Sequence, residues 1–134
     1  MDKPKFILDG DNFQTLEEFY DEISSIFSLP SWWGRNLDAF NDVLRSDFMP
    51  KQGYIIIWKN SQLSKQFLGY EETVRELLKR LEKSHPDNVS YIQKQIDEAK
   101  QQIGLTVFDW LVEIIRDHCL GGTEEEDNAE LILE

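Results

Sequence analysis

The sequence predicts an α/β fold in which a small three-stranded parallel sheet is packed by helices in a three-layer-like arrangement, with an inserted helical segment. Short apolar runs at residues 6–8, 54–58 and 129–133 are separated by long stretches of helical periodicity. Because parallel strands need long crossovers, helices between these runs suit a parallel sheet. At 134 residues the chain is too short for two ordinary cores, so residues 1–134 are expected to form one domain.

The first part of the chain is predicted to contain one strand and two helices. Residues 6–8 are followed by turn formers, as expected for a buried strand and its exit. Thr15 and Glu18 fit a capping box at the start of the first helix. The second helix should begin at Asn36 or a neighbour and end before Pro50. Its predicted apolar stripe consists of Leu37, Phe40, Val43 and Leu44.

The middle strand, at residues 54–58, has no apolar–polar alternation. That pattern is typical of a strand covered on both faces in a parallel sheet. A short irregular helix is expected at about residues 60–67.

The second part of the chain is predicted to contain three longer helices and the last strand. Amphipathic helices at residues 71–83 and 89–103 could pair as a hairpin. A strongly apolar helix follows at residues 107–120 and ends at Gly121 and Gly122. The final strand at residues 129–133 closes the sheet.

The charge balance restricts the range of partners. Twenty-six acidic and fourteen basic side chains give a formal charge of −12, which repels phosphate backbones, so no direct nucleic-acid ligand is expected. A basic protein partner would be attracted, although the same charge could serve solubility alone.

Cysteine use and hydropathy indicate the compartment. Cys119 is the only cysteine, and the first residues do not form a secretory leader. No apolar run approaches the roughly 20 residues that span a bilayer. We therefore expect a cytoplasmic protein with no membrane partner.

The segment from residue 29 to residue 42 carries the strongest functional signal. Trp32 and Trp33 precede Gly34 and a helix on which Asp38 and Asp42 lie one turn apart, so both carboxylates project from one face. Exposed aromatics beside carboxylates are typical of interface anchors, since they combine buried area with pairing to Arg or Lys.

Simpler interpretations of these residues stay open. The two aspartates could form an ordinary solvated face. We expect Trp33 to pack in the core while Trp32 stays partly exposed. Gly34 could bring the backbone close to a ligand or could be a plain loop glycine.

In this segment the chain resembles the barstar family of ribonuclease inhibitors. The resemblance also includes the opening strand, the strand ending at Trp58, the helix at residues 111–118 and the last strand. Its most specific part consists of Leu29-Pro30, Trp32-Trp33, Gly34, Asn36-Leu37-Asp38-Ala39 and Asp42.

The resemblance implies a barstar fold whose second helix and preceding loop plug the active site of a ribonuclease. Asp38 and Asp42 match the family aspartates that meet cationic residues of the enzyme. Asp117 is a weaker match to a further family carboxylate. The other partner-binding candidates are Trp32, Trp33, Gly34 and Asn36.

The implied protein is a cytoplasmic immunity protein against a basic extracellular-type ribonuclease, and it should be a monomer when free. It should have no catalytic residue, no metal and no cofactor.

Two features depart from the family. Arg35 and Arg45 flank the acidic face, which would suit a different enzyme. Residues from about 70 to 104 form the inserted segment, expected to be a helical hairpin away from the binding loop, although its polar side chains could form a second binding surface.

Two rival functions are weighed against inhibition. An adaptor of the same fold could bind a target other than a nuclease, because the fold does not fix the target. An enzyme could use Asp38 and Asp42 as an acid–base pair, or with Asp117 as a metal site, but the spacing supports neither. His85 and His118 are expected to be structural.

Overall fold

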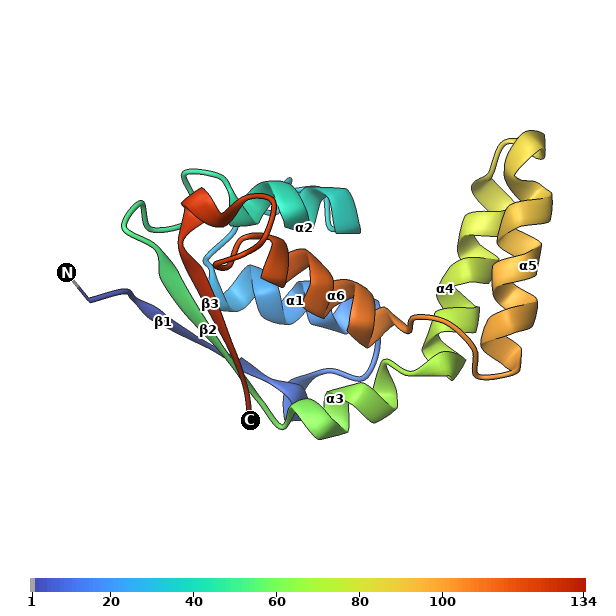
Figure 1. Cartoon of the computed structure of the whole chain (residues 1–134), viewed down its shortest axis with the longest axis horizontal. Helices are drawn as coiled ribbons and strands as arrows, with labels where there is room; N and C mark the ends of the chain where they lie inside the picture. Colours follow the sequence, from blue (N-terminus) through green and yellow to red (C-terminus); the bar gives the residue numbers. More distant parts are fainter. Residues whose placement is uncertain (1) are drawn as a thin grey trace.

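The computed structural model describes residues 2–134, which form three strands, six α-helices and three short 3-10 helices (Figure 1). The strands are β1 (Lys5–Asp9), β2 (Tyr54–Lys59) and β3 (Ala129–Leu133). The α-helices are α1 (Leu16–Ile26), α2 (Leu37–Leu44), α3 (Ser61–Phe67), α4 (Tyr70–Lys83), α5 (Val89–Lys100) and α6 (Val107–Asp117). The 3-10 helices are η1 (Gly10–Asn12), η2 (Pro86–Asn88) and η3 (Glu125–Asp127). The predicted α/β fold is confirmed.

The sheet has the order β1-β2-β3, and both pairings are parallel. Its register places Ile7 beside Ile57, which in turn lies beside Ile132. Both crossovers move in the same direction along the sheet, and crossovers are almost always right-handed. Consequently α1, α2 and α6 lie on the same side of the strands (Figure 1).

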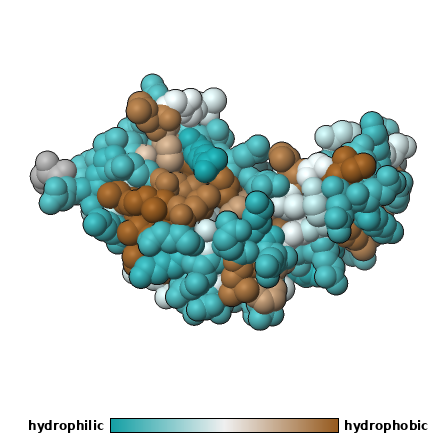
Figure 2. All heavy atoms as spheres, turned by 60° about the horizontal axis from the view of Figure 1, so that its bottom comes forward, coloured by the Kyte–Doolittle hydropathy of each residue, from teal (hydrophilic) through white to brown (hydrophobic). Residues whose placement is uncertain are grey.

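The other face of the sheet is open, so the expectation that residues 54–58 are covered on both faces is wrong. Ile7 and Ile132 are 41% and 44% exposed, and Ile57 between them is half-buried. The sheet therefore has helices on one face instead of lying between two layers. Isoleucines stand on the open face where polar residues would have alternated with apolar ones. Without that alternation, the sequence did not predict an exposed face. Figure 2 shows hydrophobic side chains gathered on the surface at the end of the molecule that contains the sheet.

The main core, between the sheet and the helices, contains a cluster of aromatic rings among aliphatic side chains. Trp58 is fully buried, with its ring centroid 5.8 Å from that of Phe19 and 5.0 Å from that of Phe108. Its indole Nε1 donates to Ser64 Oγ at 3.0 Å, so its polar atom is satisfied. Burying a phenylalanine side chain such as that of Phe19 contributes roughly 1.5–3 kcal/mol.

Helices α4 and α5 pair as the predicted hairpin and enclose a smaller core of Leu77, Ile96 and Ala99. Trp110 of α6 packs against both cores and so joins the hairpin to the main body. In Figure 1 the hairpin stands at the end of the molecule opposite the N-terminus.

Within residues 2–134, no helix combines the length and the apolar character that a membrane span would require.

Candidate partner-binding site

Helix α2 presents its two aspartates to solvent because its other face is buried. Asn36 caps the helix, since its Oδ1 accepts from the Ala39 backbone N–H at 2.8 Å, which confirms the predicted start. Phe40 and Val43 are buried in the main core. Asp38 and Asp42 are both exposed on the outer face.

The loop before α2 divides its two tryptophans between core and surface, as expected. Trp33 is 6% exposed, and its Nε1 donates to Ser24 Oγ at 2.8 Å. Trp32 is 75% exposed, and its ring centroid lies 6.1 Å from that of Phe48, which is 42% exposed. Trp32 and Phe48 thus form a small apolar surface beside the acidic helix, while Trp33 fixes the loop from within.

Gly34 is required by the conformation of the loop itself. Its φ is +102°, a value that residues with a side chain rarely adopt. A Cβ at this position would lie 2.8 Å from the Cβ of Ala39. The glycine therefore lets the loop pass close to the first turn of α2.

The two aspartates differ in their electrostatic surroundings. Within residues 2–134, Asp38 has neither an ion pair nor a side-chain hydrogen bond. Asp42 pairs with Arg45, whose Nη1 also donates to Glu124 Oε1 at 2.7 Å. These two carboxylates raise the pKa of Arg45. Arg35, on the other flank, pairs with Asp21 of α1.

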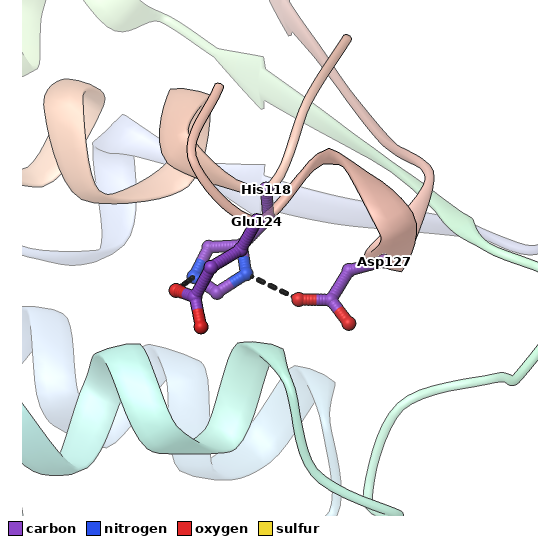
Figure 3. Close-up of side chains that lie close together, drawn as sticks. All are labelled: His118, Glu124 and Asp127. Atoms are coloured by element: carbon purple, nitrogen blue, oxygen red, sulfur yellow. Dashed lines mark hydrogen bonds and ion pairs between the residues drawn. The ribbon is translucent and has the colours of Figure 1, made fainter. Parts of the chain in front are cut away.

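A buried histidine connects α2 to the end of α6 and the following loop (Figure 3). His118 is fully buried, with Nδ1 2.6 Å from Asp127 Oδ2 and Nε2 2.7 Å from Asn41 Oδ1. The same Nε2 lies 3.5 Å from Glu124 Oε2. Through these contacts the loop after α6, which contains Glu124 and Asp127, supports the helix that carries Asp38 and Asp42.

Sequence reasoning missed Asn41 and Glu124 as parts of this region. The run of acidic residues after Gly122 was visible, but its contact with Arg45, at the C-terminal cap of α2, joins positions 79 residues apart. Local patterns carry no signal for such a pairing.

The side chains of His118, Glu124 and Asp127 lie close enough together to suggest a cation site. However, Asp127 and Glu124 approach opposite nitrogens of the imidazole ring. One ion could therefore not bind both carboxylates and the ring unless the side chains rearranged. Hydrogen bonds account for the cluster as it stands. The second acidic group of this kind, Glu17, Glu72 and Glu76, is occupied by Arg75 and Lys79.

Asp117 is not brought together with the α2 aspartates in this arrangement. Its exposed side chain lines a groove of about 750 Å³ along β3, together with Cys119 and Leu131. Glu124, in the loop after α6, instead accepts from Arg45 at the C-terminal cap of α2.

The helical hairpin lies beside the loop that precedes α2, because residues of both line one groove, so the expectation that it points away is wrong. The Leu16 backbone N–H donates to the buried carboxylate of Glu72 at 2.8 Å, and Arg75 pairs with Glu17. These contacts hold α4 against the start of α1, next to the start of α2.

Comparisons with known proteins indicate the family to which the chain belongs. A family model described as "Barstar (barnase inhibitor)" matches residues 4–105. The chain is also similar to a protein of Bacillus subtilis (strain 168) named "Putative ribonuclease inhibitor YrdF". The two are 30% identical over 94 residues, which cover 66% of this chain and 96% of the relative.

Proposed function

The chain belongs to the barstar family, and from this membership we propose that it inhibits a ribonuclease by covering the active site with the acidic face of α2 and the loop before it. The family and the Bacillus relative support ribonuclease inhibition in general. The observation that carries the binding mode is the display of Asp38 and Asp42 on one exposed helix face beside Trp32, which is 75% exposed.

The proposed mechanism needs no chemistry by the inhibitor. A ribonuclease cleft presents Arg, Lys or His to the substrate phosphates, and two carboxylates one turn apart can take the place of these phosphates. Trp32 and Phe48 would supply apolar contact area at the edge of the charged centre. Trp33, Gly34 and Asn36 would hold the loop in its binding conformation, while Asp117 would lie at the periphery.

We further propose that the target is a basic extracellular-type ribonuclease, bound by one copy of the chain that is monomeric when free. The formal charge of −12 favours association with a basic protein. Acting in the cytoplasm, such an immunity protein would protect a cell that makes a secreted nuclease.

The direct test is RNA cleavage by a panel of small basic microbial ribonucleases, followed by fluorescence with and without this protein. Stoichiometric loss of cleavage that Asp42→Ala relieves would support the proposal. Asp97→Ala, at an exposed position of α5, is the matched control and should inhibit as well as the wild type. If no enzyme in the panel loses activity, the proposed function is wrong. Hydrolysis of RNA by the purified protein itself, abolished by Asp38→Asn, would also contradict it.

A second candidate is an adaptor that binds a protein other than a nuclease through the same surface. Basic residues beside the acidic helix, Arg35 among them, favour it because a uniformly acidic face would suit a basic enzyme better. Recovery of one defined non-nuclease partner, lost with Asp42→Ala, would support the adaptor over the inhibitor.

A further inference from the structure

A groove of about 750 Å³ runs between the start of α2 and the hairpin. One wall includes Asn36 and Asp38, which belong to the proposed partner-binding surface, and Arg35 beside them. The opposite wall is α4, which contributes Arg80 and Lys83. In Figure 1 the N-terminal end of α2 points toward the hairpin across this space. The groove is therefore continuous with the surface that carries the acidic helix.

The α4 wall of the groove carries three basic residues, Lys79, Arg80 and Lys83, and one acidic residue, Glu76. This wall is therefore basic on balance, although the chain as a whole carries a formal charge of −12. Lys79 is paired with Glu17 and Glu76. Within residues 2–134, Arg80 and Lys83 make no ion pair. They are three positions apart on α4, so they share one side of the helix. These two cations are available to a ligand in the groove.

The basic wall is held rigidly relative to α2. Arg80 lies over the ring of Trp110, with its guanidinium carbon 4.7 Å from the ring centroid. Thr73 Oγ1 accepts from the Val107 backbone N–H at 2.9 Å, and the buried Glu72 accepts from Leu16. Because α1 and α6 pack in the same core as α2, both walls of the groove are attached to that one core. A preorganised groove loses less free energy when a partner enters it.

We propose that this groove is the second half of the partner-binding surface and receives a carboxylate-bearing loop from the rim of the ribonuclease cleft. The inference rests on the proposed function and specifies the partner further. The enzyme would present cations to Asp38 and Asp42 and, beside them, an acidic rim to Arg80 and Lys83. The hairpin would thereby select among ribonucleases, because an enzyme with a basic or neutral rim would meet like charge or no partner there.

The test uses charge reversal on the full-length protein with a ribonuclease that it inhibits. Lys83→Glu should weaken inhibition by about tenfold or more, because it places like charges at the contact. Lys100→Glu makes the same change of net charge at an exposed position of α5 outside the groove, and it should stay within about twofold of the wild type. Lys83→Gln should give an intermediate loss. Circular dichroism of each variant verifies that the hairpin stays folded.

A compensating change in the enzyme makes the test specific. Replacing the acidic rim residue of the ribonuclease by Lys should weaken binding of the wild-type inhibitor and restore binding of Lys83→Glu. If Lys83→Glu and Lys100→Glu inhibit equally well, the groove is not part of the interface, and the proposed function stands without it. If the wild-type protein inhibits no ribonuclease, both the function and this inference are wrong.

Discussion

The two aspartates of α2 occupy different environments, and this determines how each should respond to mutation. Asp42→Ala should weaken the complex most, for two reasons. It leaves a cation of the partner without its carboxylate, and it leaves Arg45, which then pairs only with Glu124, close to that cation. Asp38→Ala should come next, since it removes only the pairing with the partner. Both losses should be on the order of 2–5 kcal/mol, measured by isothermal titration or by inhibition kinetics.

Folding provides the control for these substitutions. Both side chains are exposed, so thermal unfolding of either variant should stay close to that of the wild type. Wild-type affinity in both variants would remove the acidic face from the binding site.

Gly34 should tolerate no larger side chain. Gly34→Ala is expected to lower the free energy of unfolding by about 1–3 kcal/mol, because it combines a positive φ with a contact of 2.8 Å to Ala39. Gly104→Ala is a matched control, since Gly104 has a φ of +90° but open space where the Cβ would stand. Denaturant unfolding measures the loss of free energy in both variants, and the difference between them is the cost of the contact with Ala39 beyond that of the backbone conformation. Equal losses would mean that this contact is negligible.

At the scale of elements, the sequence predicted the helices and strands well where a local signal existed. The cap at Asn36 and the apolar stripe of α2 gave that helix its position and its outward face. Thr15 does accept from the Glu18 backbone N–H, but the Glu18 carboxylate accepts from Gln14 instead of closing the predicted capping box. The open face of the sheet was not predicted because isoleucines there mimic a buried strand.

The link between α2 and the loop after α6 can be tested at His118. His118→Leu should lower the free energy of unfolding by about 1–3 kcal/mol, because Asp127 and Asn41 lose their shared partner in a largely buried site. Denaturant titration measures this loss. His85→Leu is the control, since the side chain of His85 is 68% exposed and only caps η2. An equal effect of the two substitutions would contradict a specific role for His118.

Helix α4 contains a carboxyl group whose ionisation opposes folding. Burial raises the pKa of Glu76, so its charged form is less favourable in the folded state than in the unfolded one. Glu76 therefore contributes stability while it is protonated and loses that contribution as pH rises through its folded-state pKa. Glu76→Gln should raise the free energy of unfolding at neutral pH by less than about 1 kcal/mol, because Arg75, Lys79 and solvent screen the charge.

The gain from Glu76→Gln should vanish in acid, where both forms are neutral. Thermal unfolding measured across the acid range tests this, with Glu82→Gln as an exposed control on the same helix. A gain that persists at the lowest pH would assign the effect to packing instead of charge.

At the scale of the whole molecule, the position of the hairpin lay beyond local reasoning. Its two helices and their pairing followed from amphipathic periodicity, but its direction depends on Glu72 meeting the start of α1, 56 residues earlier in the chain. Likewise, Arg45 and Glu124 meet only because the fold brings α2 beside the loop after α6. We propose that residues 1–134 act as one domain in which the hairpin at about residues 70–104 elaborates the common fold.

The charge of the whole molecule sets the expected kinetics of association. With a formal charge of −12, the protein should attract a basic ribonuclease over distances that salt screens, so the association rate constant should fall as ionic strength rises. Stopped-flow fluorescence between about 0.02 M and 0.5 M salt would measure the slope. If the acidic face directs the approach, Asp38→Asn should reduce the slope more than Asp97→Asn, which removes the same charge from α5. Equal slopes for the two variants would assign the attraction to total charge, and a rate constant that does not change with salt would exclude electrostatic steering.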